Sequence, residues 1–180
     1  MKNYCLITCF LLFFAIDKAQ AQKNLVTNGG FEDGLYGWNN NGARVTPWDL
    51  KSGKHSCAIV APNASNWIGI DQTIRIPKKA VSLECSAWIK TTNVIKGKDE
   101  WNGAIFTIEF LDVQDKKIGD GVNIARLAGD QDWTLSKQVL KIPAGAVSFR
   151  VLLAMGYASG TMLIDDVMVK MGTADEIAKS

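Results

Sequence analysis

The side chains best suited to ligand chemistry in this sequence are its tryptophans, of which there are six. Trp48 follows a proline, and Trp67 and Trp101 each adjoin an asparagine, so all three are expected near turns or strand ends. A single indole usually packs in a hydrophobic core. Flat rings near solvent can instead stack on the apolar C–H faces of sugars, whose hydroxyls then bind nearby amide, carboxylate or guanidinium groups. Three such tryptophans favour this binding chemistry.

A catalytic set is harder to assemble from this sequence. It has one histidine, His55, and no Ser/His/Asp or Cys/His arrangement can be built around it. Two carboxylate pairs could nominally cleave a glycosidic bond, Glu109 with Asp112 and Asp165 with Asp166. On a flat strand the members of each pair point to opposite faces, so neither pair would flank one bond. The sequence therefore favours a binding protein that is not an enzyme.

Short strands are the elements that would position these residues. Runs rich in β-branched and aromatic residues alternate with period two and are separated by turn signals. We expect strands at residues 25–27, 43–47, 55–61, 67–76, 81–92, 103–111, 133–142, 147–155 and 161–171. Residues 119–132 form the longest segment without a clear strand, and loops of that length are often functional. This pattern predicts an all-β sandwich.

The first 21 residues have the pattern of a secretory signal peptide. Lys2 precedes an apolar run over residues 5–16, and small residues at Ala19 and Ala21 indicate cleavage after Ala21. The apolar run is too short to cross the roughly 30 Å hydrocarbon layer of a membrane. We therefore expect a secreted or periplasmic protein that does not insert into a membrane.

Residues 22–172 are expected to form one domain, followed by a short polar tail at 173–180. Cleavage would remove two of the 20 Lys and Arg residues and one of the 18 Asp and Glu residues, which leaves 18 minus 17, or a net charge of +1. A nearly neutral protein has no field that would concentrate nucleic acid. Nucleic acid is therefore not an expected partner.

Two cysteines remain after the expected cleavage, Cys57 and Cys85. Both lie in expected strands. In an oxidising compartment they could form a disulfide, and two buried free thiols would be equally ordinary. The sequence leaves this choice open.

Several short blocks spaced along residues 24–167 carry a family resemblance. They read NLVTNGGFEDG at 24–34 followed by Gly37-Trp38, SGKHS at 52–56, SAWIK at 86–90, Asp132-Trp133, and GTMLIDDV at 160–167. In this order they resemble carbohydrate-binding modules of families 4, 9 and 22. The resemblance implies a jelly-roll β-sandwich of two antiparallel sheets, of the galactose-binding-domain-like type. It also implies non-catalytic binding of a polysaccharide or oligosaccharide.

Modules of this group commonly hold a structural calcium ion, and the resemblance implies its ligands here. Glu32 and Asp165 would supply carboxylate oxygens, while Gly30, Ser52, His55 and Asp165 would supply backbone carbonyls. Oxygen ligands from turns and acidic residues are those that Ca²⁺ prefers. In the alternative interpretation, Glu32 and Asp165 only cap turns.

The resemblance also implies which residues contact the sugar. Trp67 and Tyr157 occupy the places of two aromatic residues that sandwich a sugar in relatives, and Arg126 lies in the long loop that presents polar contacts. At Ile70 and Ala154 this chain lacks polar residues that relatives can use. These two losses put the usual ligands of the family, xylan and β-glucan, in doubt.

In an alternative interpretation, Trp48 and Trp101 would form the binding site at the rim of the sandwich. A separate polysaccharide-degrading enzyme or an envelope protein would be a further partner of such a module. Two other functions stay open: an envelope protein that uses the same fold for protein contacts, and a small jelly-roll hydrolase or lyase.

Overall fold

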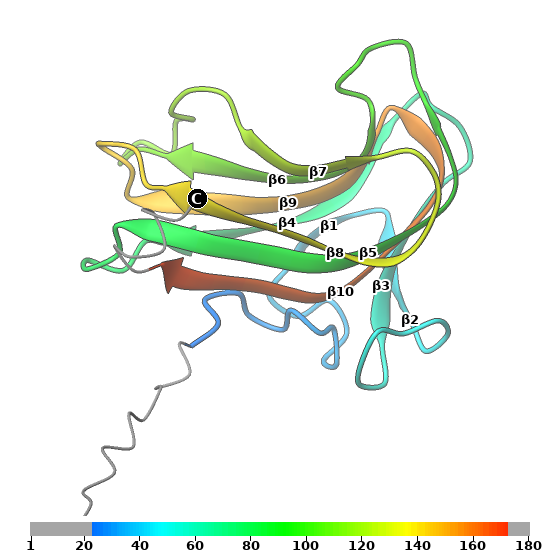
Figure 1. Cartoon of the computed structure of the whole chain (residues 1–180), viewed down its shortest axis with the longest axis horizontal. Helices are drawn as coiled ribbons and strands as arrows, with labels where there is room; N and C mark the ends of the chain where they lie inside the picture. Colours follow the sequence, from blue (N-terminus) through cyan, green and yellow to red (C-terminus); the bar gives the residue numbers. More distant parts are fainter. Residues whose placement is uncertain (1–22, 173–180) are drawn as a thin grey trace, which may run out of the picture.

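The computed structural model describes residues 23–172, which form two five-stranded sheets packed face to face (Figure 1). Sheet A has the order β1-β4-β9-β6-β7 and sheet B the order β2-β3-β10-β5-β8. The strands are β1 (Asn39–Asn41), β2 (Ala43–Thr46), β3 (Ser56–Ala61), β4 (Trp67–Arg75), β5 (Ser82–Lys96), β6 (Gly103–Leu111), β7 (Val122–Leu127), β8 (Gly129–Lys141), β9 (Ser148–Gly156) and β10 (Ala158–Gly172). All paired strands in this part of the chain are antiparallel. The expected all-β jelly-roll sandwich is confirmed.

The expected signal peptide at 1–21 and the polar tail at 173–180 lie outside the described residues. Between residues 23 and 172, no helix is long and apolar enough to cross a membrane. The domain boundaries stay predictions.

The hydrophobic core lies between the two sheets and follows the alternation of the strands. In sheet A, Phe149, Val151 and Leu153 on β9 are fully buried, as the sequence alternation predicts. In sheet B, Leu83 and Ile89 on β5 face them and are equally buried. The inner face of each sheet therefore packs against the inner face of the other, which fixes the outer faces and the end loops as the available contact surfaces.

The cysteines lie in sheet B and are free thiols. Cys57 is on β3 and Cys85 on β5, and β10 runs between these two strands. Burial raises the pKa of both thiols to about 12, so both stay neutral at physiological pH. The alternative of two buried thiols is therefore the one that the structure supports.

Three segments differ from the expected strands. Residues 25–27 do not form a strand, whereas the wholly exposed Asn39–Asn41 does, by pairing with β4. The expected loop at 119–132 instead contains β7 and the start of β8. The strands β1, β7 and β8 lie at sheet edges, where one side faces solvent, and their side chains carry a weak hydrophobic signal.

The segment that precedes β1 is tied to strands far away in sequence. The side-chain amide of Asn24 donates to the carbonyl of Val167 at 3.0 Å and accepts from the N–H of Val169 at 2.9 Å. The buried Gln72 side chain bonds both the N–H and the carbonyl of Thr27, at 2.8 and 3.0 Å. These bonds give a segment without regular structure fixed hydrogen-bond partners.

Candidate functional site

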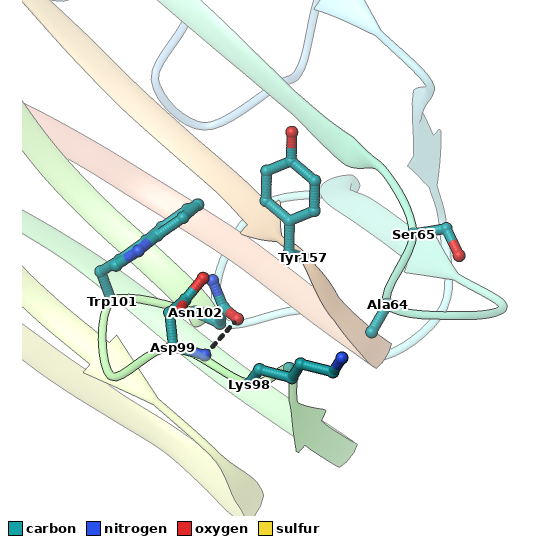
Figure 2. Close-up of a pocket in the computed structure, with 8 residues that line it drawn as sticks. Ala64, Ser65, Lys98, Asp99, Trp101, Asn102 and Tyr157 are labelled. Carbon is teal, nitrogen blue, oxygen red and sulfur yellow. Dashed lines mark hydrogen bonds between the residues drawn. The ribbon is translucent and has the colours of Figure 1, made fainter.

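A hollow lies at one end of the sandwich, beyond the ends of β4, β6 and β9, and we call it the rim pocket. In Figure 1 this end is on the right, where the green loop between β5 and β6 rises above sheet A. The rim pocket has a volume of about 460 Å³. It is lined by Ala64, Ser65, Gly97, Lys98, Asp99, Trp101, Asn102 and Tyr157. Three separate loops therefore contribute to it, and Figure 2 shows their side chains arranged around an open centre.

Two aromatic rings form the apolar part of the rim pocket. The ring centroids of Trp101 and Tyr157 are 5.4 Å apart, and the ring planes are nearly perpendicular at 84°. Trp101 is 46% exposed and Tyr157 is 41% exposed, so both keep a large apolar surface in contact with water. Such exposed rings on two rigidly connected loops are suited to contact an apolar ligand face.

The backbone of Tyr157 is held in an unusual conformation. Its φ angle is +47°, in the left-handed region that bulky side chains rarely adopt. The residue links β9 to β10, and its N–H donates to the carbonyl of Asn66 at 3.3 Å. A conformation of this kind costs on the order of 1–3 kcal/mol and tends to occur at functional sites.

Asn102 forms part of the wall of the rim pocket and was not identified from the sequence. Its side chain is only 2% exposed, and its Oδ1 accepts from the N–H of Asp99 at 3.0 Å, the bond drawn in Figure 2. Its Nδ2 is buried and has no hydrogen-bond partner. A buried donor without a partner is rare in native proteins.

Trp67 and Arg126 lie beside the rim pocket, on the outer face of sheet A. They are accommodated by two glycines paired in register, Gly156 and Gly103. A Cβ added at Gly156 would lie 2.8 Å from the Trp67 ring, and one at Gly103 would lie 3.5 Å from the Arg126 side chain. Both glycines therefore give these side chains room to lie against the sheet.

The predicted trio of Trp67, Arg126 and Tyr157 thus meets at one end of the sandwich but does not line a single hollow. Tyr157 lines the rim pocket, whereas Arg126 lines a second hollow, which shares only residues 97–99 with the rim pocket. The guanidinium of Arg126 donates to the carbonyl of Glu100 at 3.2 Å, which ties it to this loop. The aromatic partner of Tyr157 is Trp101, which the sequence had placed in the alternative rim site.

Replacing Gly156 by alanine separates the contribution of Trp67 from that of the rim pocket. The new methyl group would overlap the indole, so we expect Trp67 to be displaced and the protein to lose about 1–3 kcal/mol of stability. If Trp67 contacts the ligand, calorimetric titration will show weaker binding. If the affinity is unchanged, the aromatic contacts to the ligand come from Trp101 and Tyr157 and not from Trp67.

A row of charged side chains crosses the outer face of sheet A. Arg150 on β9 pairs with Glu109 on β6 at 3.2 Å and lies 3.9 Å from Asp71 on β4. Lys117 lies 3.7 Å from the other oxygen of Glu109. Each carboxylate in this row therefore faces a cation, and the row offers polar partners for a ligand that extends over the sheet.

Ile70 and Ala154, the two positions without the polar residues expected from the family resemblance, lie on different faces of sheet A. Ala154 is on the outer face, next to Gly69 and Ile105 in register. Ile70 is 1% exposed and belongs to the core between the sheets. The comparison made at Ile70 was therefore wrong, because its side chain does not point to the ligand face.

Trp48 lies in a different region, in the loop between β2 and β3. Its neighbour Asp49 accepts from the indole N–H of Trp133 at 3.0 Å and pairs with Lys90 at 2.8 Å, both on sheet B. Trp48 itself is 77% exposed and is not among the residues that line the rim pocket. The alternative site formed by Trp48 with Trp101 is therefore not assembled.

The expected calcium ligands are brought close together. Glu32 and Asp165 both reach the loop from Lys51 to His55. Glu32 Oε1 accepts from the N–H of Lys54 at 2.8 Å and of His55 at 3.3 Å. A Cβ built on Gly30 would lie 4.0 Å from Asp165 Oδ1. The N-terminal segment, this loop and β10 therefore meet around the Asp165 carboxylate.

A β-bulge in β10 positions this carboxylate. The register of β10 with β5 shifts between Asp165 and Met168, and Asp166 adopts a φ of +48°. Asp165 is fully buried, and its oxygens accept from the N–H groups of Lys51 and Ser52 at 3.0 Å and of Asp166 at 2.8 Å. These contacts are those that the turn-capping alternative requires.

The electrostatics of this site would also suit a cation. Burial raises the pKa of Asp165 above its usual value, and within the described chain this carboxylate has no ion pair. The N–H of Lys54 holds the pKa of Glu32 below its usual value. Residues 23–172 contain no group of three His, Cys, Asp or Glu side chains placed to hold a metal. An ion here would therefore depend on backbone carbonyls, an oxygen-only set that fits Ca²⁺.

Comparison with solved structures gives the architecture a name. The chain matches the xylan-binding CBM22-1 domain of Paenibacillus barcinonensis Xyn10C with 22% identity and a TM-score of 0.58, covering 87% of this chain and 99% of that domain. It matches TmCBM61, solved with β-1,4-galactotriose, with 16% identity and a TM-score of 0.56, covering 83% and 99%. The chain has the fold of a carbohydrate-binding module. At these identities the likeness establishes the fold of the module alone.

The same module fold also occurs within a larger protein. The enzymatically active domain of tailspike protein 4 of bacteriophage CBA120 matches with 18% identity and a TM-score of 0.67, over 83% of this chain. This chain spans about a fifth (21%) of that structure. No protein-family model and no curated protein matches the chain.

Proposed function

We propose that this protein binds a polysaccharide or oligosaccharide through the rim pocket, without catalysing its cleavage. The observation that carries this proposal is the pair of solvent-exposed rings of Trp101 and Tyr157, held at the end of a rigid sandwich. The apolar C–H face of a sugar would stack on a ring, and its hydroxyls would bind polar groups such as the Asp99 carboxylate and the Ser65 hydroxyl.

The conformation of Tyr157 supports this assignment. A glycine would adopt the left-handed backbone conformation of Tyr157 without strain, whereas a tyrosine is strained in it. The ring gains little burial in return, since it stays 41% exposed. A function for the exposed ring would account for a strained and poorly buried tyrosine.

The arrangement of the carboxylates favours binding without catalysis. Glu109 is paired with Arg150 and Lys117, and Asp112 accepts the N–H groups of Gln114 and Lys116 in the turn after β6. Asp165 is buried beneath the 51–52 loop. None of these groups lines the rim pocket, so a sugar bound there would not meet a carboxylate pair.

A glycan-binding assay with the parent protein and the variant Trp101→Ala tests the proposal. β-1,4-Galactotriose and xylohexaose are suitable first ligands, because the first occurs in a complex of a module with this fold and the second in a complex of joined CBM22-1 and GH10 modules. Stacking contributes about 1–3 kcal/mol per ring, by analogy with nucleobases, so dissociation constants in the micromolar to millimolar range are expected. Binding that persists at full strength in Trp101→Ala would contradict the proposed site. A failure to bind across a broad glycan array would favour the alternative of protein contacts.

We also propose that Gly30, Glu32, Ser52, His55 and Asp165 hold a structural calcium ion. The ion would balance the buried charge of Asp165 and link the N-terminal segment to β10. Calcium at a concentration 100 times its dissociation constant should stabilise the protein by about 2.7 kcal/mol, or roughly 5–11 °C in melting temperature. Thermal denaturation with added calcium and with excess chelator measures this. An identical melt under both conditions would leave only the turn-capping role.

The proposal includes export from the cell, with residues 1–21 as a signal peptide. A partner that degrades or displays polysaccharide outside the cytoplasm would fit such a location. Mass spectrometry of the protein recovered after export would reveal cleavage after Ala21, and a retained N-terminus would contradict it.

A further inference from the structure

The geometry of the rim pocket indicates which part of a glycan it would bind. We propose that the rim pocket binds the terminal residue of a sugar chain and not a stretch within the chain. This inference rests on the proposed function, since it concerns the same site. Three features carry it: the angle between the rings, the closed bottom of the pocket, and the polar groups that it leaves without partners.

The two rings form neither a flat platform nor a parallel clamp for a continuous chain. A chain that runs through a site can lie on rings that are coplanar, or between rings that are parallel. The planes of Trp101 and Tyr157 instead meet at 84° with centroids 5.4 Å apart, so the two rings touch edge to face. They form a corner, which presents one ring face and one ring edge to a single sugar.

The backbone closes the rim pocket below these rings. A Cβ added at Gly97 would lie 2.4 Å from the carbonyl oxygen of Tyr157 and 2.5 Å from Oδ1 of Asn102. The 97–102 loop and the turn between β9 and β10 are therefore in close contact, with no space between them for a sugar. A glycan in the corner therefore cannot continue between this loop and this turn, which favours a chain that ends in the pocket.

The polar groups of the rim pocket suit a sugar with a free end. A terminal residue carries a hydroxyl that an internal residue has lost to the glycosidic bond. Within residues 23–172, Lys98 and Asp99 form no ion pair and stay available to hydroxyl groups. Asn102 Nδ2 is a buried donor without a partner, and a hydroxyl oxygen would supply one. Because this nitrogen is covered in the free protein, neighbouring side chains must shift as the sugar enters.

Titrations with chains of increasing length test the inference. Isothermal titration calorimetry would compare galacto- and xylo-oligosaccharides with the corresponding polymers. A pocket for chain ends predicts one protein per polymer chain and an affinity that stops rising after the shortest oligomers. Borohydride reduction of the oligomers then identifies the end: lost binding indicates the reducing end, and retained binding the other end.

The variant Asn102→Asp tests the unpaired donor. Aspartate keeps the oxygen that accepts from the N–H of Asp99 and removes the amide donor, so binding should weaken roughly tenfold. The melting temperature of the variant shows whether the loop is intact, and Ser65→Ala provides a second polar probe of the pocket that does not alter the 97–102 loop.

The possible results separate this inference from the proposed function. Several proteins bound per polymer chain, with affinity that keeps rising with length, would overturn recognition of chain ends while supporting carbohydrate binding. An absence of binding to every oligomer and polymer would overturn both. Unchanged binding in a folded Asn102→Asp variant would overturn the role of the amide donor.

Discussion

Replacing Tyr157 by glycine is expected to remove most of the glycan affinity while leaving the melting temperature within a few degrees of the parent protein. Loss of one stacking ring should weaken binding by about 1–3 kcal/mol, or roughly 5- to 150-fold. Stability should change little, because glycine relieves the strain of a φ of +47°. This gain offsets the lost contact with Trp101 and the greater freedom of glycine in the unfolded chain.

Calorimetric titration and thermal denaturation of the same samples provide the two measurements. Tyr36→Ala is a matched control, because Tyr36 is 71% exposed and belongs to the segment before β1, away from the rim pocket. Its affinity should equal that of the parent. If Tyr157→Gly binds as tightly as the parent, the ring does not contact the ligand. If it melts far lower, the ring is structural and the interpretation of the strain is wrong.

Replacing Asp165 by alanine is expected to lower the melting temperature by roughly 6–12 °C. The change leaves the N–H groups of Lys51, Ser52 and Asp166 without their acceptor. Unpaired donors cost about 1–3 kcal/mol each when they stay buried, and partial hydration of the loop brings the expected total to about 3 kcal/mol. In a domain of this size, 1 kcal/mol corresponds to about 2–4 °C.

The neighbouring residue supplies the control for this change. Asp166→Asn keeps an oxygen for the hydroxyl of Ser52, and asparagine tolerates the left-handed backbone at this position. Its melting temperature should stay close to that of the parent. Repeating both melts in calcium and in chelator separates the two roles of Asp165. If Asp165 is a calcium ligand, calcium will no longer raise the melting temperature of Asp165→Ala. If Asp165 is only a turn cap, the substitution will lower the melting temperature equally in calcium and in chelator. A shift below about 2 °C in Asp165→Ala would contradict both roles.

The sequence contained enough to predict the fold because most strands bury one face in the core. The alternation of Phe149, Val151 and Leu153 is a direct consequence of that burial. Strands at the sheet edges lack this signal. The three asparagines of β1 pair with β4 through their backbones, and the side chains of Asn39 and Asn41 bond Asp71 and the Trp67 carbonyl, which hydrophobic periodicity cannot detect.

The candidate site was predictable only in part. The occurrence of Trp101 beside turn residues indicated a loop position, and Tyr157 was singled out by family resemblance. That these two rings meet depends on where β5 and β9 end, which is set by long-range pairing and not by spacing in sequence. The same limit applies to Trp48, whose loop is drawn toward sheet B by Asp49.

The length and direction of β10 set the orientation in which the protein would present its ligand. The strand starts at Ala158, directly after Tyr157, and ends at Gly172. Figure 1 shows that β10 ends at the opposite end of the sandwich. Fully extended, a strand of this length would span roughly 45 Å, and the bulge between Asp165 and Met168 shortens this distance. A reporter joined after Gly172 would therefore stand clear of an immobilised glycan, with the whole sandwich as a rigid spacer between them.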